Sequence, residues 1–193
     1  MNGNEQTQRL YRRHLSVIYN WAIKKGLLDS NPYNDSPKQT IPKISYYTQK
    51  EVEKILDGLG NRKIDKMIKV LFYTGLRRGE AGHLKEEDVL DDLIIVYGKT
   101  GRRTIPIPKE IKPIFDDLGI YTFNPESLGL ALQKRGLSAT KIRHTFATRL
   151  VRNGMDLYRI AKLMGHASVK TTEKFYAHLK PIDIKNHSDF LKL

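Results

Sequence analysis

The sequence contains no cysteine among its 193 residues. Disulfide bonds and thiolate metal sites are therefore excluded, and the composition is compatible with an intracellular protein. No apolar run approaches the roughly 20 residues that a helix needs to span a bilayer. Residues 1–6 also lack the apolar segment of a signal peptide. We therefore expect no membrane partner and a cytoplasmic location.

Acidic residues are scarce relative to basic ones. The chain has 21 Asp and Glu against 34 Lys and Arg, which gives a formal net charge of +13. This charge attracts polyanions over a range near the Debye length, about 8 Å in physiological salt. Binding to a nucleic acid should therefore weaken steeply as salt is added. Charge alone does not distinguish DNA from RNA or from an acidic membrane.

Three acidic clusters, at 86–88, 91–92 and 116–117, raise the alternative of a metal-dependent nuclease. Adjacent carboxylates in extended segments point to opposite faces, and no histidine-rich partner accompanies them. Solvated turns are the better interpretation. We therefore predict no metal site and no cofactor.

Hydrophobic spacing predicts a largely helical chain. Apolar residues recur at helical intervals over 10–22, 48–59, 64–72 and 138–151. The second segment opens with the capping-box pattern Thr-Gln-Lys-Glu, and Gly75 is placed to end the third. A β-rich apolar run then reaches a Gly-Lys-Thr-Gly turn and is followed by a second, shorter run, which predicts a β hairpin.

Five short stretches rich in reactive side chains follow one another along the chain. In order, they supply a guanidinium, an ammonium, an ammonium with a guanidinium, an imidazole and a phenol. They are 74–80 (Thr-Gly-Leu-Arg-Arg-Gly-Glu), 98–101 (Gly-Lys-Thr-Gly), 141–144 (Lys-Ile-Arg-His), 164–166 (Met-Gly-His) and 175–178 (Phe-Tyr-Ala-His). Each stretch alone has an ordinary structural explanation, but together they suit attack on a phosphodiester without a metal.

The chemistry of attack on a phosphodiester indicates a role for three of these side chains. Negative charge gathers on the phosphate oxygens in the transition state, and the paired N–H groups of Arg77 and Arg143 match two such oxygens. A hydroxyl that forms a reversible ester conserves the bond for later rejoining, and Tyr176 is the candidate. With an ordinary pKa of about 10, this phenol needs nearby cations or a base to react.

In the order of these stretches and in their local sequence, residues 48–179 resemble the catalytic domain of the tyrosine recombinases, which include phage-type integrases and chromosome-dimer resolvases. The resemblance implies a mainly α fold with a small three-stranded antiparallel β-sheet. It implies that Tyr176 attacks the phosphorus and forms a 3′-phosphotyrosyl link. Lys99, on the hairpin turn, matches the family's general acid and would protonate the departing 5′-oxygen.

The resemblance also implies roles for the remaining polar residues of the motifs. Glu80 would orient the guanidinium of Arg77, and His166 would hydrogen-bond the scissile phosphate or the nucleophile. His144 and His178 are interpreted as structural or phosphate-contacting residues. Four basic residues are expected to surround the site as candidates for contacts with the DNA backbone: Arg102, Arg103, Lys170 and Lys174.

One position departs from the family pattern. Members usually have a histidine three residues before the second arginine, and here Thr140 stands at that position. Helical residues three apart share a face, whereas residues two apart diverge by more than a quarter turn. Either Thr140 contributes a weaker hydroxyl donor, or Lys141 swings in to replace the imidazole. We favour Lys141 because of its reach, with an exposed or phosphate-contacting lysine as the alternative.

The sequence outside the motifs predicts four segments. Residues 1–28 resemble the last helix or a remnant of the family's N-terminal core-binding domain. Three X-Pro pairs mark 29–45 as an extended linker. Residues 46–180 form the expected catalytic domain, and 181–193 form a tail that the family pattern would dock on a neighbouring protomer. The chain is thus expected to be a truncated or unusually short member.

Taken together, these features predict a site-specific DNA recombinase or integrase. Its partner would be double-stranded DNA at a recombination site, on which the protein would assemble as a synaptic tetramer, from a monomer in solution. We expect it at the nucleoid of a prokaryotic cell or viral host. Two alternatives remain open: DNA relaxation like that of type IB topoisomerases, and a DNA-binding regulator that has lost catalysis.

Overall fold

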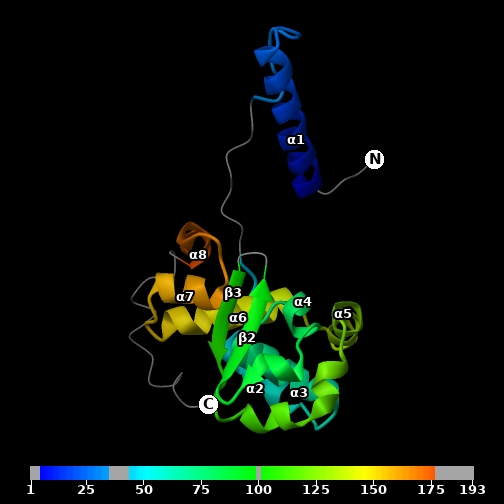
Figure 1. Cartoon of the computed structure of the whole chain (residues 1–193), viewed down its shortest axis with the longest axis vertical. Coiled ribbons are helices and arrows are strands. Elements are labelled where there is room, and N and C mark those ends of the chain that lie inside the picture. Colours follow the sequence, from blue (N-terminus) through cyan, green and yellow to red (C-terminus); the bar gives the residue numbers. More distant parts are fainter. Residues whose placement is uncertain (1–4, 35–43, 99–100, 177–193) are drawn as a thin grey trace. The chain divides into compact units, whose positions relative to one another are not determined.

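The computed structural model describes residues 5–34, 44–98 and 101–176 (Figure 1). The backbone divides into two compact units, residues 1–41 and 42–193. No helix within the described ranges is both long and apolar enough to cross a membrane.

Several predictions fall on residues outside this description. They concern the acid Lys99, most of the linker at 29–45, His178 and the tail at 181–193. These remain predictions.

The first unit consists of one long helix and a returning segment. Helix α1 (Glu5–Lys24) is followed by Gly26, which has a φ of +69° and turns the chain back. The buried Asn31 then donates its side-chain N–H to the carbonyl oxygen of Ser16 at 3.2 Å and to Oδ1 of Asn20 at 2.8 Å. The large apolar side chains that stay exposed on α1 are Leu10, Tyr11, Leu15, Val17, Ile18 and Trp21.

The second unit begins with two helices whose ends follow from local sequence. Helix α2 (Gln49–Asp57) starts at Thr48, whose side chain accepts from the backbone of Glu51 while the Glu51 carboxylate accepts from the backbone of Thr48. This is the predicted capping box. Helix α3 (Lys63–Thr74) buries seven of its 12 residues and ends at Gly75, whose φ of +63° is the left-handed conformation that glycine adopts readily.

A three-stranded antiparallel sheet follows, as the fold class predicted. Strands β1 (Val89–Leu90), β2 (Leu93–Gly98) and β3 (Gly101–Pro106) lie in the order β1-β2-β3. Ile94 pairs with Ile105, and both side chains are buried. One face of the hairpin therefore packs on the domain core.

Short elements connect the rest of the unit. The acidic cluster at 86–88 forms a solvent-exposed or half-buried 3₁₀ turn, as expected. The bounds of these connecting elements are α4 (Arg78–Ala81), η1 (Glu86–Asp88), η2 (Lys112–Asp116), η3 (Leu118–Thr122) and α5 (Pro125–Gln133).

Three C-terminal helices complete the described part: α6 (Ala139–Arg152), α7 (Leu157–Met164) and α8 (Val169–Tyr176). Helix α6 packs on α3, and α7 contacts β3, α6 and α8 (Figure 1). Buried side chains form two clusters, and α6 contributes Ile142 to the first and Ala147 to the second. Helix α6 thus joins the two halves of the core, and it carries Arg143 between the two residues that it contributes to them.

Candidate active site

Arg77 is placed by the turn that follows α3. Its backbone N–H donates to Oε2 of Glu80 at 2.7 Å, and its Nη1 donates to Oε1 of the same carboxylate at 2.8 Å. Its Nη2 donates to the carbonyl oxygen of Gly165, just after α7, at 2.8 Å. The side chain is 40% exposed. This guanidinium therefore bridges two helix ends and still reaches solvent.

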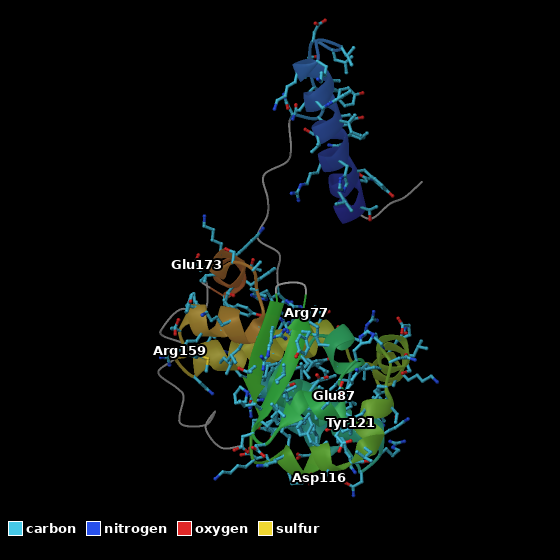
Figure 2. All side chains as sticks on the ribbon, in the orientation of Figure 1. Arg77, Glu87, Asp116, Tyr121, Arg159 and Glu173 are labelled. Carbon is cyan, nitrogen blue, oxygen red and sulfur yellow. The ribbon has the colours of Figure 1, made fainter. Side chains whose placement is uncertain are left out.

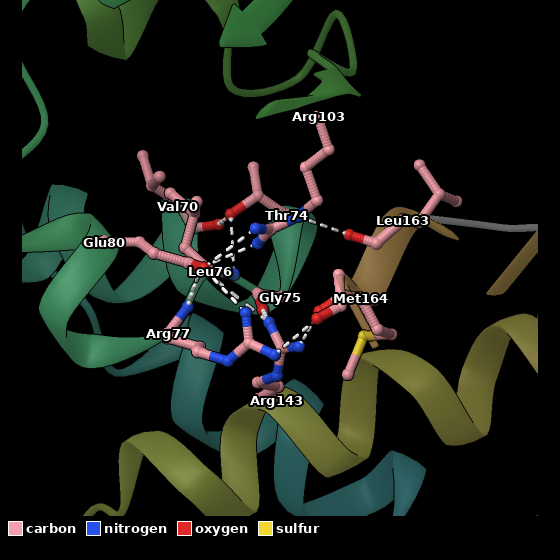
Figure 3. A network of polar contacts seen from close by, with 11 residues as sticks. Val70, Thr74, Gly75, Leu76, Arg77, Glu80, Arg103, Arg143, Leu163 and Met164 are labelled. Atoms are coloured by element: carbon pink, nitrogen blue, oxygen red, sulfur yellow. Dashed lines mark hydrogen bonds and ion pairs between the residues drawn. The ribbon is translucent and has the colours of Figure 1, made fainter. Parts of the chain in front are cut away.

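Glu80 is the hub of the charged network in Figure 3. Its side chain is only 7% exposed and also accepts both Nη groups of Arg103, at 2.8 and 2.7 Å. Burial alone would raise the pKa of Glu80, but the hydrogen bonds from Arg103 and Arg77 lower it to about 2. The carboxylate is therefore ionised at neutral pH and holds two guanidinium groups in place.

Arg143 projects from α6 into the same network. Its Nη1 donates to the carbonyl oxygen of Gly75 at 2.7 Å, and its Nη2 donates to that of Met164. Burial and then the nearby Arg77 lower the pKa of Arg143 to about 9, so the group keeps its charge at neutral pH. The end of α3 and the end of α7 thus fix both predicted arginines beside each other.

Gly75 and Gly165 leave room for side chains that pack closely against the ends of α3 and α7. A Cβ on Gly75 would lie 2.3 Å from the ring of Phe146, and a Cβ on Gly165 would lie 2.9 Å from Nη1 of Arg103. Both glycines have positive φ values, where a side chain is strained. The glycines in the Thr-Gly-Leu-Arg and Met-Gly-His stretches therefore serve packing and backbone geometry at the site.

Tyr176 lies at the end of α8 and is 1% exposed. Its hydroxyl oxygen is 2.9 Å from Nδ1 of His144, the residue that follows Arg143 on α6. Burial raises the pKa of Tyr176 to about 12, although Arg143 acts in the opposite direction. The phenol is therefore neutral at physiological pH. The sequence gives no specific partner for His144, because no local pattern connects residues so distant in the chain.

His166 follows α7 and is half-buried. Its Nδ1 lies 2.8 Å from Oγ1 of Thr172, a buried residue one helical turn before Tyr176 on α8. Burial, and then the charges of Arg143 and Arg77, lower the pKa of His166 to about 4. This imidazole is therefore neutral at physiological pH and ties the end of α7 to the helix that carries the phenol.

Thr140 and Lys141 are the two candidates to replace the family's histidine before Arg143, and their side chains lie outside the network around Glu80. Thr140 is exposed near the start of α6. The Nζ of Lys141 lies 3.9 Å from the centre of the Tyr47 ring and 3.9 Å from Oε1 of Glu51. These contacts direct the ammonium toward the start of α2. The interpretation that Lys141 replaces the missing imidazole stays a prediction, and in this arrangement its ammonium lies at Tyr47 and Glu51.

The sequence predicts DNA contacts for both Arg102 and Arg103, but the two occupy different environments. Arg102 is exposed, whereas the Arg103 side chain is 9% exposed, pairs with Glu80 and donates from Nε to the carbonyl oxygen of Leu163 at 2.9 Å. Successive residues of a strand point to opposite faces, so the two could not share one role. Arg103 is part of the network itself. Lys170 and Lys174 are exposed on α8, and their contacts with DNA stay predictions.

A groove of about 690 Å³ opens beside the network, between β3 and the end of α7. His166 and Gly165 line it together with the basic side chains of Arg102, Arg159 and Lys162. In Figure 2, the labelled acidic residue Asp116 lies toward the opposite end of the second unit from Arg77, whereas Glu173 on α8 lies at the same end as Arg77. The groove therefore joins the site to a basic surface.

Metal ligands do not gather in the described ranges. Among residues 5–34, 44–98 and 101–176, no three His, Asp or Glu side chains lie together in a way that could hold a metal ion. The acidic clusters noted in the sequence thus do not converge there.

Comparison with known proteins matches this site to one family. Residues 126–181 match the phage integrase family model. The chain is 35% identical over 181 residues to the tyrosine recombinase XerA of Pyrococcus furiosus, covering 77% of this chain and 63% of the relative. It is 32% identical over 206 residues to transposase A of transposon Tn554 from Staphylococcus aureus, covering 85% of this chain and 56% of the relative.

The fold has a close counterpart among solved structures. The Tn1549 transposon integrase, solved in complex with circular intermediate DNA, superposes with a TM-score of 0.78 at 20% sequence identity. The match covers 98% of this chain and 80% of that chain. At this identity the likeness concerns the fold. The chain spans about three fifths of the length of the curated relatives named above.

Proposed function

Since this chain belongs to the tyrosine recombinase family, we propose that it cleaves and rejoins DNA strands at a specific site through a phosphotyrosine intermediate. One observation carries the proposal. The guanidinium groups of Arg77 and Arg143 both donate to backbone carbonyl oxygens at the end of α7, and the Tyr176 hydroxyl lies against the residue next to Arg143. The guanidinium groups that would bind a phosphate and the phenol that would attack it thus belong to one site.

The proposed cleavage step uses each group for a distinct purpose. The Tyr176 oxygen attacks the phosphorus and forms a 3′-phosphotyrosyl ester, while the bond from phosphorus to the 5′-oxygen breaks. Arg77 and Arg143 stabilise the charge on the non-bridging oxygens. The departing 5′-oxygen takes a proton from Lys99, the acid implied by the family motif. Attack by a 5′-hydroxyl on the ester reverses these steps and rejoins a strand.

The free protein holds the proposed nucleophile in a resting state. Tyr176 is buried and neutral, and burial raises its pKa to about 12. Glu80 fixes the charged guanidinium of Arg77, and two backbone carbonyl oxygens fix that of Arg143. We therefore propose that DNA binding moves the end of α8 far enough for the phenol to reach the phosphate.

The proposed partner is double-stranded DNA at a recombination site. The net charge of +13 supports a polyanionic partner, and the similar Tn1549 integrase was solved with DNA. Recombination requires two duplexes, so we propose assembly of a tetramer on DNA, with residues 181–193 docking on a neighbouring protomer. Residues 1–28 would represent the last helix of a core-binding domain, and the protein would act at the nucleoid.

A covalent trap on randomised DNA tests this function and selects the target site at the same time. The protein is incubated at low salt with a pool of duplexes that carry a randomised segment and a nearby nick. Cleavage next to the nick releases a short fragment, so the strand cannot be rejoined and the protein stays attached. We expect adducts that survive denaturing detergent and that enrich one sequence. Binding without any adduct would indicate a regulator that has lost catalysis.

Strand exchange separates recombination from simple relaxation. Two labelled duplexes that carry the enriched sequence are mixed with the protein, and a supercoiled plasmid with one copy of the sequence is treated in parallel. The proposal predicts joined products from the two duplexes. Relaxation of the plasmid with no exchanged product would favour the topoisomerase-like alternative.

A further inference from the structure

The proposed cleavage step needs a group that accepts the proton of Tyr176, and His144 contacts the Tyr176 hydroxyl directly. Nδ1 of His144 lies 2.9 Å from the Tyr176 hydroxyl oxygen, which is within hydrogen-bond distance. Both groups belong to the part of the domain where α6 and α8 meet. The imidazole is thus in direct contact with the proposed nucleophilic atom.

The surrounding packing fixes this imidazole. His144 follows the anchored Arg143 on α6, and its ring centre lies 5.8 Å from that of Phe175 on α8. The residue is half-buried. Side chains of both helices therefore define where the ring sits relative to the phenol, as a group that transfers a proton in the transition state requires.

The charge state also suits a proton acceptor. Burial, and then the charge of Arg143, lower the pKa of His144 below its ordinary value of about 6.5. The titratable groups that interact with it are Arg143 on its own helix, Tyr176 on α8 and His166 after α7. The imidazole is therefore neutral at physiological pH, with one ring nitrogen free of a proton.

The other candidates for this task lie elsewhere in the described ranges. Thr140, at the position where the family usually has histidine, is exposed. Lys141 is held against the ring of Tyr47 and near Glu51. His166 contacts Thr172 through Nδ1. His144 is the imidazole that touches the phenol.

We propose that His144 is a catalytic residue, the general base that takes the proton from Tyr176 during strand cleavage. This inference rests on the proposed function. It places the base immediately after Arg143, instead of three residues before it.

Transfer of the Tyr176 proton to His144 accompanies attack on the phosphorus. The O–H bond of Tyr176 breaks, and its proton goes to Nδ1 of His144, which becomes an imidazolium. The freed electron pair on the phenolic oxygen forms the bond to phosphorus. The bond from phosphorus to the 5′-oxygen breaks, and that oxygen keeps the pair and receives a proton from the general acid. In rejoining, the imidazolium returns its proton to the departing phenolic oxygen.

A bound DNA phosphate would favour transfer of the proton to His144. In the free protein, Arg143 opposes a second positive charge on His144. A DNA phosphate placed between Arg77 and Arg143 brings negative charge close to the imidazole and favours its protonated form. The base would therefore become effective when the substrate is in place.

The test measures adduct formation on the enriched nicked duplex as a function of pH. One substrate carries the natural 5′-oxygen leaving group, and a second carries a bridging 5′-sulfur, which departs without help from an acid. The variants are His144→Gln, which removes the base, and Lys99→Met, which removes the proposed acid. His83→Gln, at an exposed histidine, is the matched control.

We expect His144→Gln to slow adduct formation about 100-fold or more with both substrates. The pH-rate profile of this variant should also lose the rise that accompanies deprotonation of an imidazole. Lys99→Met should be slow with oxygen and recover with sulfur, and His83→Gln should match the unchanged protein. A His144→Gln rate within about threefold of the unchanged protein on sulfur overturns the proposal. A slow variant that keeps the same pH dependence also overturns it, because His144 would then only position Tyr176.

Nitrogen NMR of the unchanged protein gives a readout that does not depend on activity. The proposal requires neutral His144 with its proton on Nε2, so that Nδ1 accepts the Tyr176 hydroxyl proton. Replacement by Tyr176→Phe should then shift the Nδ1 signal. A proton on Nδ1 in the unchanged protein overturns the assignment of the base even if His144→Gln fails to fold. If the unchanged protein forms no adduct at all, the proposed function fails instead.

Discussion

The arginine side of the site and the phenol side are built on different principles. Arg77 and Arg103 share the buried carboxylate of Glu80, and Arg143 is anchored to backbone carbonyl oxygens at two helix ends. These charges are fixed before any substrate arrives. Tyr176 is neutral, buried and held by one hydrogen bond to His144. Charge stabilisation is thus preorganised, whereas the nucleophile requires activation.

This difference implies that substitutions on the arginine side and on the phenol side affect different properties of the protein. Loss of Glu80 would leave buried guanidinium groups uncompensated and should damage the fold, because an unpaired buried charge is costly. Loss of His144 or Tyr176 removes a group that is assigned to proton transfer or nucleophilic attack and leaves the charged network in place. Stability measurements and adduct kinetics should therefore separate the two sides.

The largest effect on stability is expected for Glu80→Gln. Its side chain is 7% exposed and contacts both Arg77 and Arg103, so we expect the free energy of unfolding to fall by about 3–5 kcal/mol. Urea denaturation at neutral pH measures this change. Glu87→Gln is the matched control, since its pair with Lys85 is exposed and should contribute about 0–1 kcal/mol. Equal losses for the two variants would contradict the central role of Glu80.

The stability difference between the unchanged protein and Glu80→Gln should depend on pH. The folded-state pKa of Glu80 is about 2, below its ordinary value of 4.5. A lowered pKa gives stability that is complete above the ordinary value and is lost as pH falls toward the folded value. The difference should therefore shrink between pH 4.5 and about 2. Denaturation at several pH values checks this, and a constant difference would show that Glu80 does not act through its charge.

A somewhat smaller effect, on rate, is expected for Arg143→Lys. Lysine keeps the charge but loses the planar paired donors, so adduct formation should slow by about 100-fold to 1,000-fold. The rate on the trapping duplex measures this, with thermal unfolding as a check of the fold. Arg159→Lys is the control because Arg159 is exposed on α7. A similar small change in both variants would show that Arg143 supplies only positive charge.

The smallest effect is expected for Lys141→Met. Removing the ammonium from the Tyr47 ring should cost about 0.5–1 kcal/mol of stability. The adduct rate should stay within about threefold of that of the unchanged protein, because proton transfer is assigned to His144. A loss of about 100-fold would return the base to Lys141, the residue that the sequence pattern favours.

Local features of the site were predictable from the sequence, and long-range contacts were not. The capping box of Thr48 and the helix end at Gly75 follow from neighbouring residues, and both are present. The contact of His144 with Tyr176 spans 32 positions, and that of Arg103 with Glu80 spans 23. Such contacts depend on how helices and strands pack, which spacing does not specify.

The different environment of Arg103 has a simpler cause. The sequence predicts exposed basic residues around the site, but alternation along β3 turns Arg103 toward the core and leaves Arg102 outside. The family pattern likewise draws attention to the positions before Arg143. The residue in contact with the phenol is the one immediately after it.

Peptide mapping of the trapped protein–DNA adduct tests most directly whether Tyr176 is the nucleophile. The unchanged protein and Tyr158→Phe, which alters an exposed tyrosine, should both carry the DNA strand on the peptide that contains Tyr176. Tyr176→Phe should form no adduct while keeping its fold and its affinity for the duplex. An adduct that persists in Tyr176→Phe, or that maps to another residue, would contradict the central claim.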